Sequence, residues 1–336
     1  MKRVGKLDGV GNIVVEDVPI PPLGAGQLLV RNQRSLISRG SEIGARYLRE
    51  GAVDPAIMGY SSAGVVEQIG PGVTEFAPGQ RAAVVAPHAE YVVGDLSGSV
   101  VGSTLSIPDG VSFDQATFHP LVTSAVTWAE IAGVQPDQTV VVLGQGLVGN
   151  LVLQAVRAYQ PGRLIAVDTL EMRCALAGRM GADDVINAAT ADPVQAVHEL
   201  TGGRGADLVM DCVGGKAGVR SFAQAQDMCR PLGTIHLIGL YHGEPLPLDA
   251  GKIQRKRLIG GLYSPVPRAP YAERAMAALR DRQIEVDPLI THHFPYTAAQ
   301  EAFDLLYHRL GDAIGVILTW PGSEPGSEVT TFPPAL

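Results

Sequence analysis

The glycines Gly144, Gly146 and Gly149 form the pattern G-x-G-x-x-G directly after the apolar run TVVVL and at the start of a helical segment. In such a pattern the first glycine permits a tight turn, the second lets the backbone approach a pyrophosphate, and the third allows close packing of helix on strand. The helix N-terminus adds free N–H groups and the positive end of its dipole. We therefore predict a dinucleotide site that includes Leu147 and Val148; the alternative is a glycine-rich turn without a ligand.

An acidic residue stands where the ribose of such a dinucleotide would lie. Asp168 ends the apolar run RLIAVD, 19 residues beyond Gly149, and can accept hydrogen bonds from the ribose hydroxyls. A 2′-phosphate there would meet a carboxylate, so we expect NAD rather than NADP. Arg173, one turn into the next helix, leaves NADP as the less favoured alternative, and Asp168 could equally serve as an N-cap for that helix.

Composition excludes several classes of partner and site. The chain has 336 residues, 46% hydrophobic and 18% charged, with a formal net charge of −8, which is a poor match for nucleic acid or anionic membrane surfaces. Its three cysteines, an odd number without close pairing, can build neither a disulfide framework nor a four-cysteine zinc site. No secretory segment is apparent at the N-terminus. We expect a cytoplasmic protein that binds a small-molecule substrate.

Three regions of different pattern must position these residues. Up to about residue 120 the chain has short β-rich runs such as QLLVRNQRSLI, GVVEQIG and RAAVVA. From about 122 apolar strands alternate with helices, through TVVVLG, NLVLQAVRAYQ, RLIAVD, MRCALAGRM, DDVIN, DLVMDCVG and TIHLIGL, which indicates a parallel sheet of βαβ units. After about 264 follow two helical runs, YAERAMAALRDRQI and AAQEAFDLLYHRL, and a last strand, GVILTW. The fold class is α/β.

These residues, with three further blocks, resemble the medium-chain dehydrogenase/reductase superfamily, to which alcohol and polyol dehydrogenases belong. The blocks are GVVEQIGPGVTEFAPGQRAAV, TGGRGADLVMDCVGG and DPLITHHFPYTAAQEAFDLL, and the resemblance runs in order from about residue 20 to 320. It implies a β-rich GroES-like catalytic domain, 1–121 plus 265–336, and an inserted Rossmann domain, 122–264, with the substrate cleft where they meet.

The resemblance also implies further contacts in the Rossmann domain. It places Cys212, Ile238 and Leu240 among the residues that bind the cofactor, and His236, Tyr241 and His242 beside the loop near the nicotinamide, where they could be simply polar lining. It implies a homodimer or homotetramer joined through the edge strand in RKRLIGGLY.

The chain departs from the zinc-dependent members of the family at all three catalytic ligand positions. Arg39, Tyr60 and Pro120 stand where the family carries its zinc ligands, and the four-cysteine structural zinc lobe is missing. Tetrahedral zinc needs thiolate, imidazole or carboxylate donors. The segments ISRGSE and MGYSSAGVVEQIG instead resemble zinc-free members, including the N-terminal halves of some bi-domain oxidoreductases. We expect no zinc.

Four residues are the catalytic candidates by family position: Tyr60, Ser41, Arg39 and His119. Tyr60 is the simplest proton donor, and since an ordinary tyrosine has a pKa near 10, a neighbouring cation such as Arg39 would have to lower it for base catalysis. Ser41 lies where the family relays a proton. Each candidate has a structural alternative: a core tyrosine, or an Arg39–Glu42 ion pair. His292 and His293 are adjacent on a predicted strand, so they point to opposite faces and cannot both bind one metal.

Three functions remain open on the sequence. The first is a zinc-independent, NAD(H)-dependent oxidoreductase that interconverts a secondary alcohol, such as a polyol, cyclitol or sugar derivative, and its ketone. The second is reduction of an activated C=C bond, as in zinc-free enoyl or quinone reductases; these tend to lack the glycine and acid pattern of Gly144, Gly146 and Asp168. The third is a dinucleotide-binding protein without catalysis.

Overall fold

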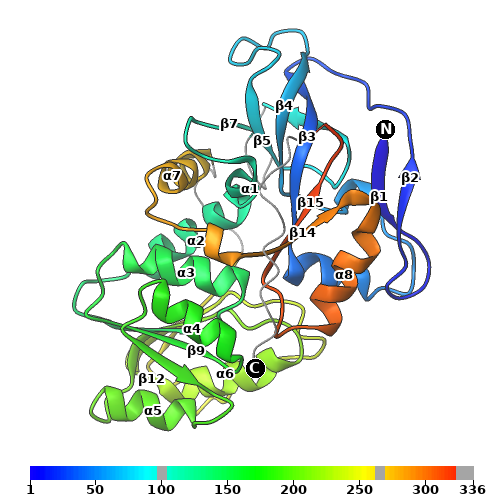
Figure 1. Ribbon diagram of the computed structural model, residues 1–336. Helices are drawn as coiled ribbons and strands as arrows, with labels where there is room; N and C mark the ends of the chain where they lie inside the picture. The colour runs from blue at the N-terminus through cyan, green and yellow to red at the C-terminus, as the bar shows by residue number, and fades with distance from the viewer. Residues whose placement is uncertain (97–103, 262–268, 323–336) are drawn as a thin grey trace. The chain divides into compact units, whose positions relative to one another are not determined.

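The computed structural model describes residues 1–96, 104–261 and 269–322 (Figure 1). The chain forms two compact units, Met1–Pro120 with Val286–Leu336, and Leu121–Glu285. The first unit thus combines both ends of the sequence, and the second is one continuous segment. The expected boundary at 264/265 lies outside the described residues.

Antiparallel strands dominate the first unit. A sheet of seven strands has the order β14-β15-β3-β4-β5-β7, with β6 paired to β3, and a separate pair is formed by β1 and β2. The strands are β1 (Lys2–Lys6), β2 (Ile13–Asp17), β3 (Gln27–Ile37), β4 (Ser62–Ile69), β5 (Arg81–Val84), β6 (Tyr91–Asp95), β7 (Leu105–Ser106), β14 (Ile290–Pro295) and β15 (Gly315–Thr319). Strand β15 lies antiparallel beside β3, so the C-terminal part of the chain completes a sheet that the N-terminal part begins.

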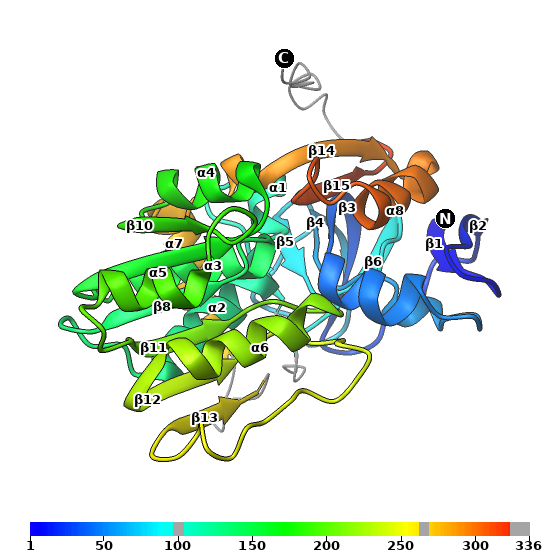
Figure 2. The ribbon, with the colours of Figure 1, turned by 90° about the horizontal axis from the view of Figure 1, so that it is seen from below.

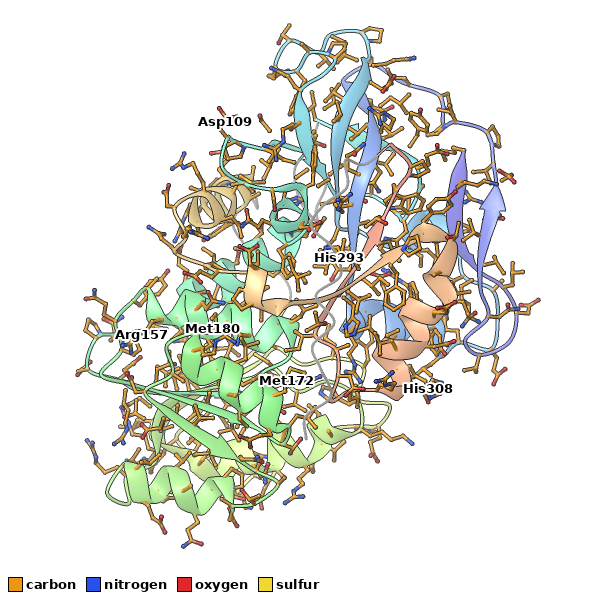
Figure 3. The ribbon with its side chains drawn as sticks, viewed as in Figure 1. Asp109, Arg157, Met172, Met180, His293 and His308 are labelled. Atoms are coloured by element: carbon orange, nitrogen blue, oxygen red, sulfur yellow. The ribbon has the colours of Figure 1, made fainter. Side chains whose placement is uncertain are left out.

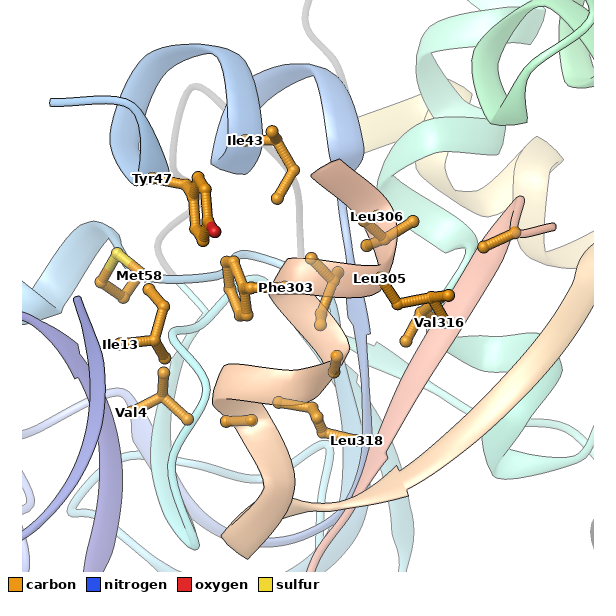
Figure 4. Close-up of a cluster of buried hydrophobic side chains, with 14 of the residues drawn as sticks. Val4, Ile13, Ile43, Tyr47, Met58, Phe303, Leu305, Leu306, Val316 and Leu318 are labelled. Carbon is orange, nitrogen blue, oxygen red and sulfur yellow. The ribbon is translucent and has the colours of Figure 1, made fainter. Parts of the chain in front are cut away.

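Short helices cover this sheet, and one of them holds a hydrophobic cluster together. They are the π-helix η1 (Arg39–Tyr47), η2 (Pro55–Ile57), α1 (Phe113–Ala116), η3 (Asp287–Leu289), η4 (Tyr296–Ala298) and α8 (Ala299–His308). Figure 4 shows Phe303 of α8 among Ile13, Tyr47 and Met58, all buried. The contact between Tyr47 and Phe303 packs η1, which carries the candidate residues Arg39 and Ser41, against α8.

The second unit is a six-stranded parallel sheet in the order β10-β9-β8-β11-β12-β13. Its strands are β8 (Thr139–Leu143), β9 (Arg163–Asp168), β10 (Asp184–Asn187), β11 (Ala206–Asp211), β12 (Cys229–Leu237) and β13 (Arg257–Gly260). Numbered along the chain, this order reads 3-2-1-4-5-6, the Rossmann arrangement, in which ligands bind at the carboxyl ends of the strands. The expected α/β fold class is confirmed.

Helices alternate with these strands along the chain (Figure 2). They are α2 (His119–Ala132), which begins at the end of the first unit, α3 (Leu147–Arg157), α4 (Glu171–Arg179), α5 (Pro193–Leu200), α6 (Ala217–Met228) and α7 (Ala269–Arg280). One face of the sheet buries Val141, Ile165 and Val209 together with Phe222 of α6 and Val197 of α5. Apolar residues on both faces explain why these strands appear in the sequence as continuous hydrophobic runs.

The expected catalytic domain includes residues 269–285, but in the structure this segment belongs to the second unit. On α7, Tyr271 donates a hydrogen bond to Glu130 of α2 at 2.8 Å, and the side chain of Gln154 on α3 bonds both the N–H and the carbonyl of Glu285. These contacts fasten the segment to helices of the Rossmann sheet.

Among the described residues, no helix has both the length and the apolar character that crossing a membrane requires.

Candidate active site

The glycine loop joins β8 to α3 in the second unit, and its geometry requires glycine at two of the three motif positions. Gly144 has φ +81°, a left-handed conformation that residues with a Cβ rarely adopt. A Cβ on Gly149 would lie 1.7 Å from the Gly144 carbonyl oxygen. At Gly146, the N-cap of α3, the nearest atom to an added Cβ is Arg173 Nη1 at 3.7 Å. The turn therefore fits the cradle of a pyrophosphate, with Leu147 and Val148 in the first turn of α3.

Asp168 lies at the carboxyl end of β9, beside the glycine loop. Its Oδ2 accepts the N–H of Gln145 at 2.6 Å, and its Oδ1 accepts those of Thr169 and Leu170 at 2.7 and 3.0 Å. The side chain thus ties the loop to the residues before α4, but the N-cap of α4 is Leu170, so the alternative role of Asp168 as an N-cap is wrong. A carboxylate has about four acceptor positions, so about one remains for a ribose hydroxyl.

Arg173 of α4 faces the same carboxylate. Its Nη1 lies 3.8 Å from Asp168 Oδ2, and burial lowers the pKa of the guanidinium while the charge of Asp168 opposes that shift. The structure therefore brings Arg173, Asp168 and Gly146 together, as the sequence predicted, with the arginine directed toward the aspartate.

Two neighbouring loops add the other predicted cofactor residues. Cys212 follows β11, its N–H donates to the Leu143 carbonyl at 2.9 Å, and its side chain packs against the position of Gly149. Burial raises the pKa of the Cys212 thiol well above its usual value. The N–H of Ile238 donates to the Asp211 carbonyl at 2.9 Å, and the Leu240 carbonyl accepts from Gly215 at 3.0 Å. The carboxyl ends of β8, β9, β11 and β12 thus gather the predicted set.

Sequence reasoning missed Asp211, the last residue of β11. Its side chain is fully buried, its Oδ1 accepts from Ser221 Oγ at 2.7 Å and from the Val213 N–H at 3.2 Å, and burial raises its pKa to about 6. By these bonds Asp211 shapes the loop that carries Cys212. Its position as the last residue of an apolar strand, like that of Asp168, was the available signal.

His236 lies within β12, not in the following loop. Its side chain is fully buried, and neither ring nitrogen has a hydrogen-bond partner in the part of the chain that the structure describes. Burial lowers its pKa to about 4, and Arg257 adds to the shift. His242 lies 3.3 Å from the Val213 carbonyl through Nε2, and Tyr241 is exposed.

We expect His236 to destabilise the fold in acid. Between pH 6.5 and 4 the unfolded chain binds a proton that the folded chain excludes, so stability falls as the pH falls, by about 2 kcal/mol at pH 5. The raised pKa of Asp211 has the opposite effect, but it is common to the parent and to a His236→Leu variant. The unfolding midpoint of the parent should therefore fall relative to that of His236→Leu as the pH is lowered from 7.5 to 5. A difference that stays constant with pH would contradict this assignment.

In the first unit, three of the four candidate catalytic residues, Arg39, Ser41 and Tyr60, lie at or near the start of η1. The hydroxyl of Tyr60 donates to Ser38 Oγ at 2.5 Å, and Ser41 lies close enough to lower the pKa of Tyr60. Gly59 has φ +104°, and a Cβ there would lie 2.7 Å from the backbone nitrogen of His88. The structure thus brings Tyr60 and Ser41 together, as predicted, and adds Ser38, which sequence reasoning missed.

The expected effect of Arg39 on Tyr60 is wrong. Burial raises the pKa of Tyr60 to about 12, and the cation that partly offsets this is Arg46. Arg39 Nε instead donates to the Leu306 carbonyl of α8 at 3.1 Å. The Tyr60 side chain is therefore a phenol throughout the physiological pH range, able to donate a proton but unsuited to act as a base.

The structural alternative for Arg39, an ion pair with Glu42, is also not formed. Glu42 and His88 are both fully buried and lie 2.7 Å apart, between Oε2 and Nε2. Sequence reasoning missed His88, because the short run PHAEY reads only as the approach to a strand.

His119 and the histidine pair of β14 lie elsewhere. His119 is fully buried at the start of α2, with Nδ1 3.3 Å from the Ala116 carbonyl. His293, labelled in Figure 3, bonds Asp114 at 2.9 Å, whereas His292 stacks on Phe294. The two adjacent histidines therefore have separate partners, as their positions on a strand predicted.

The donor set does not fit a zinc ion. The three family ligand positions carry the guanidinium of Arg39, the phenol of Tyr60 and the ring of Pro120, and none is a ligand that tetrahedral zinc prefers. Nor do three His, Cys, Asp or Glu side chains gather as a metal site anywhere in the described ranges.

Comparisons with known proteins agree with this architecture. The profile of the family described as "Zinc-binding dehydrogenase" matches residues 148–278. L-Idonate 5-dehydrogenase of Vitis vinifera is 27% identical over 296 residues, 78% of this chain and 79% of that protein. Human sorbitol dehydrogenase is 25% identical over 341 residues, 90% of this chain and 92% of that protein.

A solved structure extends the agreement to the fold. Galactitol-1-phosphate dehydrogenase from Escherichia coli matches with a TM-score of 0.81 at 22% sequence identity, covering 95% of this chain and 100% of that one. The glycine loop, the strand order and these relatives together support the assignment of the chain to the medium-chain dehydrogenase/reductase superfamily of NAD(P)-dependent oxidoreductases.

Proposed function

We propose that this protein is a zinc-independent, NAD(H)-dependent oxidoreductase that interconverts a secondary alcohol and its ketone. The observation that carries the proposal is Tyr60, which stands at a family ligand position, is hydrogen-bonded to Ser38, and remains protonated because its pKa is about 12. When bound, the nicotinamide supplies or accepts the hydride.

Tyr60 would steady the substrate oxygen. As a ketone is reduced its oxygen gains negative charge, and a preorganised hydroxyl that donates to it stabilises the transition state. The single phenolic hydrogen of Tyr60 would then turn from Ser38 Oγ to the substrate oxygen, and the Ser38 hydroxyl would donate to Tyr60 in return. Ser41, which lies close enough to lower the pKa of Tyr60, would relay the proton. The bond of Arg39 to Leu306 favours a structural role for this arginine over direct contact with the substrate.

Polyhydroxylated substrates are the class that we propose, since relatives are named for sorbitol and L-idonate. The test is turnover of NAD with a panel of polyols, cyclitols and sugar derivatives, and of NADH with the matching ketones, quinones and enones. Reduction of enones or quinones alone would favour the C=C reductase instead. Tight NAD binding with no turnover on any member would favour the protein without catalysis.

We expect the purified protein to turn over without zinc, because guanidinium, phenol and proline replace the three ligands. Elemental analysis should find far less than one zinc per chain, and a chelator should leave the rate unchanged. Loss of activity with the chelator, restored by added zinc, would overturn the zinc-independent mechanism.

We expect NAD to bind at least about tenfold more tightly than NADP, because the Asp168 carboxylate would repel a 2′-phosphate. Asp168 holds three backbone N–H groups, so replacing it would also disturb the loop. Calorimetric titration of the parent and of Arg173→Gln with both cofactors is the cleaner measurement. Tighter binding of NADP by the parent, lost in Arg173→Gln, would show that the arginine selects the phosphate.

The edge strand β13 supports self-association and completes the proposal. Its only strand partner among the described residues is β12, and Leu258 on β13 and Leu232 nearby are 42% and 67% exposed. An open edge of this kind is suited to pairing with a second copy. We propose a homodimer or homotetramer in the cytoplasm.

A further inference from the structure

Glu42 is a buried acidic residue linked to Tyr60 through Ser38, and the proposed chemistry does not use it. Glu42 is fully buried, its Oε1 accepts the N–H of Ser38 at 2.8 Å, and its Oε2 bonds His88 Nε2 at 2.7 Å. Burying a carboxylate is costly unless its oxygens are paired and hydrogen-bonded. Both oxygens of Glu42 have such a partner.

His88 is fixed on its other side as well. Its Nδ1 lies 2.8 Å from Ser35 Oγ, which also accepts the indole N–H of Trp320 at 2.9 Å. The His88 N–H donates to the carbonyl of Met58 at 2.7 Å, two residues before Tyr60. The imidazole is therefore held by Ser35 of β3 on one side and by Glu42 on the other, while the backbone of His88 is tied to the segment that leads into Tyr60.

Ser38 links this buried pair to Tyr60. It stands directly before η1, its N–H is held by Glu42, and its Oγ accepts the hydroxyl of Tyr60. One residue thus carries both bonds, so a change in the direction of the Ser38 turn would change the direction in which the Tyr60 hydroxyl points.

We propose that Glu42, clamped by His88, is a positioning residue that fixes Ser38 and thereby aims the Tyr60 hydroxyl. This inference deepens the proposed function and rests on it for the role of Tyr60. Glu42 and His88 would act on the orientation and the pKa of Tyr60, without contacting the substrate oxygen themselves.

The charge of Glu42 adds a second effect. The charged groups that act on Tyr60 are Glu42 and Arg46, both on η1, and the His88 ring is linked to Tyr60 through Glu42 and Ser38. Glu42 contributes to the raised pKa of Tyr60, whereas Arg46 opposes it. A negative charge at this place favours the phenol, which is the form that donates a hydrogen bond.

Glu42→Gln is the variant that separates charge from packing. The amide oxygen of Gln can still accept from Ser38, and its amide N–H can donate to His88 Nε2 if the proton of the imidazole moves to Nδ1. Ser35 Oγ can accept from that nitrogen, so every hydrogen bond is retained. The matched control is Asp304→Asn, which alters a carboxylate of the same unit that accepts from Tyr47 at 2.5 Å.

The first measurement is turnover on the substrate found in the panel. We expect Glu42→Gln to lower kcat about ten- to hundredfold with little change in KM, the usual scale for a misdirected catalytic group. Asp304→Asn should keep the parent rate. In a Tyr60→Phe background, Glu42→Gln should cause no further loss. An equal loss in both backgrounds would overturn the positioning role and leave the proposed function intact.

The second measurement does not depend on activity. The signal of Tyr60 in protein labelled with ¹³C at the tyrosine ζ carbon is assigned by its absence in Tyr60→Phe. We expect Glu42→Gln to move this signal and to make Tyr60 ionise at lower pH, while Asp304→Asn leaves it unchanged. A Tyr60 signal insensitive to Glu42→Gln would overturn the inference, even if Tyr60→Phe keeps full turnover and the proposed role of Tyr60 itself fails.

Discussion

Replacing Tyr60 by phenylalanine is expected to lower kcat about a hundred- to a thousandfold, with NAD binding unchanged. Loss of one hydrogen-bond donor to a developing oxyanion has this scale. The variant removes only the hydroxyl that donates to Ser38, and the glycine loop that we propose for the dinucleotide belongs to the other unit. The effect should therefore fall on the chemical step.

The matched control is Tyr47→Phe. Tyr47 is buried in the same unit and donates its hydroxyl to the carboxylate of Asp304, and burial raises its pKa as it does that of Tyr60. Removing that hydroxyl should cost stability but leave kcat near the parent value. If Tyr60→Phe turns over within about threefold of the parent, far less than donor loss predicts, Tyr60 is a packing residue.

The geometry of the glycine loop could be predicted because its signals are local in the sequence. The run TVVVL, the three glycines and the helix that follows lie in one stretch, so the backbone alone brings them together. Asp168 was predictable for the same reason, since it ends the next strand. The sequence did not reveal that the Asp168 carboxylate accepts hydrogen bonds from three backbone N–H groups, which occupy most of its acceptor positions.

The surroundings of Tyr60 could be predicted only in part. Tyr60 and Ser41 were found through family position, but the pairing of Glu42 with His88 joins residues 46 apart through the fold of a sheet. No spacing rule reveals such a contact. The direction of Arg39 depends on the carbonyl of Leu306, far along the chain, and so its effect on Tyr60 was predicted wrongly.

The assignment of 269–285 failed for a similar reason. The amphipathic pattern correctly indicated the helix α7, but a pattern shows only that a helix has an apolar face, not which surface buries it. The side chains of Glu130 and Gln154, which bond Tyr271 and Glu285, decide that question.

The largest loss of cofactor binding is expected from Gly149→Ala. Its Cβ would lie 1.7 Å from the Gly144 oxygen and 2.8 Å from the Gly144 carbonyl carbon. Both are backbone atoms of a turn whose φ of +81° is already restrictive, so neither can move without opening the loop. We expect a cost above about 4 kcal/mol in stability of the second unit, the range of severe core disruption, together with loss of NAD binding.

Gly146→Ala is the variant that separates the ligand from the fold. A Cβ there meets only Arg173 Nη1, at an ordinary contact distance of 3.7 Å, so the unfolding midpoint should stay at the parent value. A methyl group at the N-cap of α3 would nevertheless occupy the space where a pyrophosphate approaches the backbone, so NAD affinity should fall. Thermal unfolding and calorimetric titration of both variants give the comparison. A Gly149→Ala protein that unfolds at the parent midpoint would contradict the turn geometry. Full NAD affinity in Gly146→Ala would place the pyrophosphate elsewhere, because the fold accepts the added methyl group and only a ligand bound at this loop would be blocked by it.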